Sequence, residues 1–391
     1  MKIALVAGTR PEIVKMAPVR AAFDVDIDTQ PYWISTGQHG SLAEQTLDVF
    51  GIRPNCHLAL SWDKASLPSL TANLIEALAL EYVRIKPGLV IVQGDTASAF
   101  AGATAAHLSN IPVAHVEAGL RSGDLANPFP EEGFRRMISP IADLNFAPTD
   151  AAHSNLLASG VAAEKIFVTG NTVVDAVEMI AGRDNKPAIL DAIPAGADLV
   201  LVTAHRRENW QSGIASICKA ILELRGRHPN AYFVLPAHPN PRVRDTVSDF
   251  LADEANICLI EPLAYPDFIA VLKHATLVLS DSGGVQEEAP SFGVPVLVLR
   301  ERTERGEAIE AGTAKLVGTD RNRIVYEANR LLSDRQARSR MVKSGNPFGD
   351  GHAGARIAAI SKTFLKRPHQ VEPAKPSRFD ALMNVAMTAM G

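Results

Sequence analysis

The stretch Leu277-Val-Leu-Ser-Asp-Ser-Gly-Gly-Val-Gln-Glu-Glu288 runs from an unbroken apolar segment into a polar, glycine-containing one. The apolar part predicts a buried strand, and the residues after it predict the start of a helix. Ser282, Gly283 and Gly284 would then present backbone N–H groups at a helix N-terminus, where the dipole favours an anion such as a diphosphate. Glu288 follows about one and a half turns later, where its carboxylate could accept hydrogen bonds from ribose hydroxyls. The stretch predicts a metal-free grip on a nucleoside diphosphate.

The same pattern of a strand followed by a helix recurs along the chain. Between the short apolar runs, segments such as Ser69–Arg84 and Ile214–Arg225 carry apolar residues at helical spacing. Nearly unbroken apolar strands that alternate with helices indicate parallel sheets covered on both faces. The predicted strands are Ile3–Ala7, Tyr32–Ser35, Leu89–Val92, Val113–Val116, Leu144–Phe146, Ile166–Thr169, Leu199–Thr203, Tyr232–Leu235, Ile257–Ile260, Leu277–Ser280, Val296–Leu299 and Lys315–Val317.

Two such series in a row predict an α/β fold of two doubly wound, Rossmann-like domains with a cleft between them. In such folds, ligands sit in the loops that follow the strands. A polar, proline-bearing stretch, Asp184–Asp198, separates the two series. We expect residues 1–169 to form the first domain and residues 170–349 the second. A helix at about 350–366 should cross back onto the first domain, and residues 367–391 should form a loosely ordered extension.

The bulk composition narrows the class of protein. The chain has 391 residues and 47% hydrophobic content, which suits two cores. A net charge of −4 gives no overall attraction to nucleic acid or anionic lipid, so we expect neither as a partner. The three cysteines, Cys56, Cys218 and Cys258, are far apart, which favours a reducing compartment over a disulfide framework or a zinc cluster. No run has the length of a signal peptide's core or a membrane span, so we expect a cytoplasmic protein.

Charged residues follow several strands of the first series. Arg10 and Lys15 come after the first strand and suit a diphosphate, although two solvated cations on a surface helix would look the same. Asp95, Glu117 and Glu131 lie after later strands, and we expect all three at one edge of a parallel sheet. Crowding raises the pKa of at least one carboxyl group, which is how enzymes obtain an acid and a base near neutral pH. The alternative is a helix cap for Asp95 and independent surface charges for the others.

The second series offers further polar candidates. His205 precedes two arginines directly after a strand, which is typical of a phosphate clamp, although a structural histidine would fit the same pattern. Arg305 ends a charged run just past Val296–Leu299, and we expect one of these charges to reach the ligand while others pair on the surface.

Taken together, these residues resemble the non-hydrolysing UDP-N-acetylglucosamine 2-epimerases, which have the GT-B fold. The resemblance runs from Met1 to about Leu365 and rests on several motifs in the family's order. The motifs are Gly8-Thr-Arg-Pro-Glu12, Thr36-Gly-Gln-His39, Gly94-Asp-Thr96, His115-Val-Glu-Ala-Gly-Leu-Arg121, Thr169-Gly-Asn-Thr172, His205-Arg-Arg-Glu208 and Asp281-Ser-Gly-Gly-Val-Gln-Glu-Glu288.

The resemblance implies an isomerase that inverts C2 of the sugar in UDP-N-acetylglucosamine through loss and re-addition of UDP. It implies no cofactor, no metal and a homodimer. It also assigns roles by position. The catalytic residues would be Asp95, Glu117, Glu131 and His205, with His205 also near the UDP. The substrate-binding residues would be Arg10, Lys15, Phe268, Ser282, Gly283, Gly284, Glu288 and Arg305, among which Glu288 accepts from the ribose.

The chain departs from the family's pattern at several positions, which are Gln93, Phe134, Pro140, Leu263 and Gly306. Gln93 stands where the family often has histidine, and Phe134 and Pro140 replace polar residues. The segment Gly40–Ala43 lacks the charged residues of the family's second, allosteric substrate site. These departures leave open an epimerase acting on a modified UDP-N-acetylhexosamine. A GT-B glycosyltransferase, a hydrolysing epimerase and a silent nucleotide-sugar sensor are further alternatives.

Overall fold

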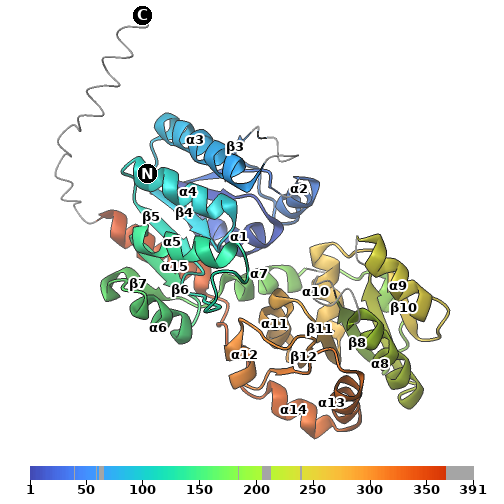
Figure 1. Ribbon diagram of the computed structural model, residues 1–391. Helices are drawn as coiled ribbons and strands as arrows, with labels where there is room; N and C mark the ends of the chain where they lie inside the picture. The colour runs from blue at the N-terminus through green and yellow to red at the C-terminus, as the bar shows by residue number, and fades with distance from the viewer. Residues whose placement is uncertain are drawn as a thin grey trace, which may run out of the picture.

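A computed structural model describes residues 1–38, 40–58, 60, 66–183, 185–204, 213–237 and 240–366. The first series of strands forms one parallel sheet in the order β3-β2-β1-β4-β5-β6-β7, and the second forms another in the order β10-β9-β8-β11-β12-β13. Figure 1 shows the two sheets with their helices as separate lobes. In each sheet the strand order reverses once, at β1/β4 and at β8/β11, and ligands of doubly wound folds bind outside such reversal points.

The first sheet contains β1 (Lys2–Ala7), β2 (Gln30–Ser35), β3 (Cys56–His57), β4 (Leu89–Gln93), β5 (Val113–Val116), β6 (Leu144–Ala147) and β7 (Ile166–Val168). The helices that follow in sequence are α1 (Arg10–Asp24), α2 (Gly40–Val49), α3 (Leu67–Ile85), α4 (Ala97–Leu108), α5 (Glu131–Ile141), α6 (Asp150–Ala158) and α7 (Thr172–Ala181). Apolar side chains fill both faces of this sheet, as expected for a parallel sheet.

The second sheet contains β8 (Asp198–Thr203), β9 (Ala231–Pro236), β10 (Ile257–Ile260), β11 (Leu277–Ser280), β12 (Val296–Val298) and β13 (Ala314–Leu316). Its helices are α8 (Gly213–Arg227), α9 (Pro241–Leu251), α10 (Tyr265–His274), α11 (Gly283–Glu288), α12 (Gly306–Glu310), α13 (Arg321–Ser333) and α14 (Arg335–Val342).

All twelve predicted strands are confirmed to within one or two residues at each end. The prediction missed β3, whose two residues are too short for a pattern.

The last described helix is α15 (Ala353–Lys366). It packs against α1 and α7, and Figure 1 shows it among the helices of that lobe. Asp175 of α7 holds its start by accepting the backbone N–H groups of Ala353 at 3.2 Å and Gly354 at 2.7 Å. A Cβ atom on Gly354 would lie 2.8 Å from the Pro18 carbonyl, so glycine permits the close approach of α15 to α1.

Among the described helices, none combines the length and the apolar composition that crossing a bilayer requires. The predicted extension, residues 367–391, lies outside the described residues.

Candidate functional site

Two joined hollows lie at the reversal points of the sheets. The larger has a volume of about 530 Å³, and the predicted residues that line it are Arg10, Lys15, Phe268, Ser282, Gly283, Gly284, Glu288 and Arg305. We call it the nucleotide hollow after the ligand that the sequence predicts for these residues. The smaller has a volume of about 380 Å³ and is lined by the predicted residues Asp95, Glu117 and Glu131, and we call it the hexose hollow for the same reason. Pro11, Lys15 and Arg305 line both, so the two hollows meet at two cations. The remaining predicted residue, His205, lies outside the described residues.

The loop after β1 is fixed by a capping box at the start of α1. The Thr9 hydroxyl accepts the Glu12 backbone N–H at 3.4 Å, and the Glu12 carboxylate accepts the N–H groups of Gly8 at 2.9 Å and Thr9 at 2.7 Å. Thr96, from the loop after β4, donates its hydroxyl to Glu12 at 2.5 Å. Burial raises the pKa of Glu12. This carboxyl group therefore joins the loops that carry Arg10 and the Asp95 region.

Asp95 is not the cap of α4, so the alternative reading of this residue was wrong. The N-cap is Thr96, whose hydroxyl accepts the Ala99 N–H at 3.1 Å. Asp95 instead pairs with the guanidinium of Arg135, which comes from α5 and also lines the hexose hollow. Arg135 was not predicted as a site residue. It stands beside Arg136 on the same helix, and the sequence alone does not show which of the two side chains points into the hollow.

Glu117 follows β5 with a left-handed backbone, φ 62°. Such conformations are unfavourable for residues other than glycine, and they cluster at functional sites. Three donors reach its carboxylate, namely the Lys15 ammonium, the Gln93 amide and the Asn171 amide, the last at 3.2 Å. Gln93, one of the departures from the family's pattern, is thus a direct partner of a predicted catalytic residue.

A buried ion cluster joins the two lobes where the hollows meet. Glu287 of α11 lies 2.9 Å from the Lys15 ammonium of α1, and the Arg305 Nε donates to it at 2.9 Å. Although burial opposes ionisation of Glu287, the two cations hold its pKa below the ordinary value. Burial likewise opposes ionisation of Lys15, yet Glu117 and Glu287 raise its pKa. Sequence reasoning selected Glu288 and missed its neighbour Glu287.

Glu288 lies deep in the nucleotide hollow. Its burial raises its pKa to about 7, although the Tyr265 hydroxyl donates to its carboxylate at 3.1 Å and opposes that shift. The ring of Tyr265 also faces Arg10, whose guanidinium carbon lies 5.6 Å from the ring centroid. Tyr265 therefore contacts both Glu288, through its hydroxyl, and Arg10, through its ring.

Two other departures from the family's pattern line the hollows. Phe134 of α5 lines the hexose hollow and stacks on Phe100 with ring centroids 4.8 Å apart, so its ring belongs partly to the core. Leu263 lines the nucleotide hollow beside Phe268. Both replacements make the walls less polar.

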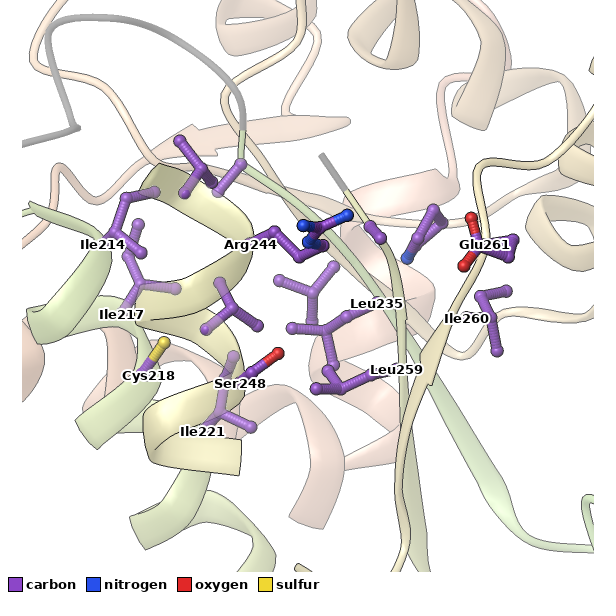
Figure 2. Close-up of a pocket in the computed structure, with 16 residues that line it drawn as sticks. Ile214, Ile217, Cys218, Ile221, Leu235, Arg244, Ser248, Leu259, Ile260 and Glu261 are labelled. Atoms are coloured by element: carbon purple, nitrogen blue, oxygen red, sulfur yellow. The ribbon is translucent and has the colours of Figure 1, made fainter. Parts of the chain in front are cut away.

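A third, apolar hollow of about 300 Å³ lies inside the second lobe, between α8, α9 and the ends of β8, β9 and β10, and it shares Pro236 and Ala237 with the nucleotide hollow. Figure 2 shows Ile214, Ile217 and Ile221 on one side of it and Leu235 and Leu259 on the other. Its walls are mostly core residues of that lobe. The predicted site residues that the structure describes line the other two hollows instead.

Two parallel sheets wound in the same strand order, with neighbouring hollows at their reversal points, place this protein in the GT-B fold class. Within that class, the chain belongs to the UDP-N-acetylglucosamine 2-epimerase family, because the family model of that description matches residues 22–362. The resemblance predicted from the sequence is therefore confirmed.

Individual relatives support the same family assignment. The chain is 42% identical over 372 residues to the UDP-N-acetylglucosamine 2-epimerase of Salmonella typhimurium, a match that covers 93% of this chain and 99% of the relative. It is 43% identical over 358 residues to the enzyme of the same name from Bacillus subtilis, covering 91% and 94%. The crystal structure of UDP-GlcNAc 2-epimerase from Neisseria meningitidis bound to UDP-GlcNAc superposes with a TM-score of 0.86 at 40% identity, covering 94% of this chain and 100% of the other.

Proposed function

We propose that this protein interconverts UDP-N-acetylglucosamine and UDP-N-acetylmannosamine without hydrolysis. One observation carries the proposal: the hollow lined by Asp95, Glu117 and Glu131 shares two cations, Lys15 and Arg305, with the neighbouring hollow lined by Ser282, Gly283 and Gly284. The similarity to enzymes named UDP-N-acetylglucosamine 2-epimerase supports the same substrate.

The proposed reaction explains why both hollows are needed. The C2 proton is not adjacent to a carbonyl group, so simple deprotonation is out of reach. Instead a base takes that proton, the C2–H electron pair forms a C1–C2 double bond, and the C1–O pair leaves with UDP. UDP then adds back to C1 of the resulting 2-acetamidoglucal while C2 takes a proton on its other face. Such a sequence requires carboxylates near the sugar and cations on the departing diphosphate.

The residue roles follow the two hollows. We assign the proton transfers to Asp95, Glu117 and Glu131, which line the hexose hollow. Lys15 and Arg305, on the boundary, would receive the charge of the departing diphosphate. Arg10 and the helix start Ser282–Gly284 would hold the phosphates, with Glu288 on the ribose and Phe268 on the uracil side. The catalytic role of His205 remains part of the proposal on the strength of its motif.

Further sequence predictions belong to the proposal. These are the division into domains at 169/170, the return of residues 350–366, the extension 367–391, a homodimer, a cytoplasmic location and no nucleic-acid partner. Closure of the two lobes would retain the glycal between elimination and re-addition.

Incubation of the protein with UDP-N-acetylglucosamine in D₂O tests the reaction. We expect ¹H NMR to show loss of the C2 proton signal and the appearance of UDP-N-acetylmannosamine. No deuterium uptake would favour a glycosyltransferase lacking its acceptor, and free N-acetylmannosamine with UDP would indicate a hydrolysing enzyme. UDP-hexosamines modified at C3, C4 or C6, assayed in parallel, show whether a modified sugar is the better substrate.

The Asp95→Asn variant separates an enzyme from a silent sensor. We expect it to abolish deuterium uptake while UDP binding, measured by calorimetry, survives, because Asp95 lines the hexose hollow and not the nucleotide hollow. Wild-type turnover in this variant would refute the role assigned to Asp95.

A further inference from the structure

Arg135 is a buried cation that pairs directly with Asp95 in the wall of the hexose hollow. Its side chain is only 8% exposed, and its Nη2 pairs with a carboxylate oxygen of Asp95. An ion pair between a guanidinium and a carboxylate fixes the direction of the carboxylate as well as its charge, because the planar donor group is directional. The orientation of Asp95, which lies in the loop between β4 and α4, thus depends on a residue of α5.

Glu132 anchors Arg135 from behind. The Glu132 side chain is fully buried, and its carboxylate accepts the Ser122 N–H at 3.0 Å and the Arg136 Nε at 2.8 Å. The Arg135 Nη1 lies 3.4 Å from the same carboxylate. Burial opposes the ionisation of Glu132, but these donors hold its pKa below the ordinary value. Arg135 is therefore held between two carboxylates, the buried one of Glu132 and that of Asp95, which lines the hexose hollow.

The other basic groups nearby have different partners. His115 is buried, its ring contacts the Gly94 carbonyl at 2.7 Å, and burial lowers its pKa to about 4, so it is neutral at physiological pH. Arg121 donates to the Leu120 carbonyl at 2.8 Å. Among the described residues, Arg135 is the cation paired with Asp95.

We propose that Arg135 is a positioning residue that presents Asp95 to the hexose. This inference rests on the function proposed above. The guanidinium holds one carboxylate oxygen and leaves the other directed toward the reacting sugar. Without this contact, Asp95, whose side chain is 23% exposed, would turn among several hydrated orientations. Small displacements of a reacting group are costly, since a misplacement of about 1 Å lowers a rate by about 100-fold.

Arg136 provides a matched control. It neighbours Arg135 on α5 and shares Glu132, but its side chain is 41% exposed and lies outside the lining of either hollow. Arg135→Ala leaves Glu132 with the Ser122 N–H and Arg136, and it leaves Asp95 open to water, so the fold should survive. Thermal unfolding and circular dichroism of both variants check this point.

We expect Arg135→Ala to lower kcat for UDP-N-acetylglucosamine by about 100-fold and Arg136→Ala to leave it within about twofold of the wild type. UDP affinity of both variants should stay within about threefold of the wild type, because neither arginine lines the nucleotide hollow. Free guanidinium ion at millimolar concentration should restore at least about a tenth of the lost turnover to Arg135→Ala, and Arg135→Lys should lie between the two.

The inference is overturned by wild-type kcat in Arg135→Ala, by an equal loss in Arg136→Ala, by a parallel loss of UDP affinity, or by no recovery with guanidinium. A deformed hollow would show no such recovery, so the last result separates positioning from folding. Failure of the proposed function appears differently, as a wild-type protein that takes up no deuterium. If the wild type takes up deuterium and Arg135→Ala has the same kcat, only the role of Arg135 is refuted and the proposed function stands.

Discussion

Glu288→Gln offers a direct test of the buried nucleotide hollow. Burial raises the pKa of Glu288 from its ordinary 4.5 to about 7, even though the Tyr265 hydroxyl, Arg10 and Lys15 act in the opposite direction. Repulsion from Glu287 adds to the effect of burial. Glutamine has the same shape and can still accept from Tyr265, but it cannot ionise. The substitution therefore removes the titration and keeps the packing.

The sign of the effect follows from proton linkage. Between pH 4.5 and about 7 the folded protein retains a proton on Glu288 that the unfolded chain releases. The stabilising contribution of this group is full below pH 4.5 and is lost as the pH rises through about 7. The difference between the two pKa values corresponds to about 3 kcal/mol of unfolding free energy.

Equilibrium urea unfolding of wild type and Glu288→Gln at pH 5, 6, 7 and 8, without ligand, measures this contribution. We expect an advantage for the variant of about 1 kcal/mol at pH 5, where unfolded Glu288 already ionises, and this advantage grows to about 3 kcal/mol by pH 8. Every other titrating group is common to both proteins, so the difference between the two curves isolates Glu288. Parallel curves would contradict this prediction, because they would mean that Glu288 ionises in the folded state as it does in water.

Further predictions concern the ion cluster and the glycine loop. Glu117→Gln should abolish turnover while UDP binding measured by calorimetry survives, and wild-type turnover would contradict its assigned role. Lys15→Met should lower the unfolding free energy by about 3 kcal/mol or more, since it leaves Glu287 and Glu117 facing a neutral side chain; an unchanged urea midpoint would show that the pair contributes nothing. Gly283→Ala should weaken UDP binding by about tenfold with little loss of stability, because its Cβ would lie 3.1 Å from the Arg305 guanidinium carbon and displace that cation. Unaltered UDP affinity would show that the guanidinium moves aside without effect.

Most strands could be predicted from the sequence because an apolar run of four to six residues is long enough to be recognised as a buried strand. The runs Ile3–Ala7 and Leu277–Ser280 are buried strands in the centres of their sheets. The two-residue strand β3 was not predicted, because it forms by pairing with β2 and its own two residues carry no strand pattern. Strand order could not be read either, since it depends on which strands pair across the sheet.

For the candidate site, too, some features could be predicted from the sequence and others depended on packing. The loops that carry Asp95, Glu117 and Ser282–Gly284 follow strands at or beside the reversal points, so position along the chain was enough to select them. Thr96 and not Asp95 turned out to cap α4, because two adjacent polar residues can each satisfy a helix start. Only packing decides which one does so.

The alternation of strands and helices and the kinds of polar groups at the strand ends can be predicted from the amino-acid sequence alone, because both follow from local patterns of apolar and polar residues. Packing determines which of two adjacent like residues lines a hollow. Arg135 lines the hexose hollow and Arg136 does not, while Glu288 lines the nucleotide hollow and Glu287 pairs with Lys15 and Arg305. Successive residues on a helix point about 100° apart, and the direction of each is set by the packing of the helix against the rest of the protein.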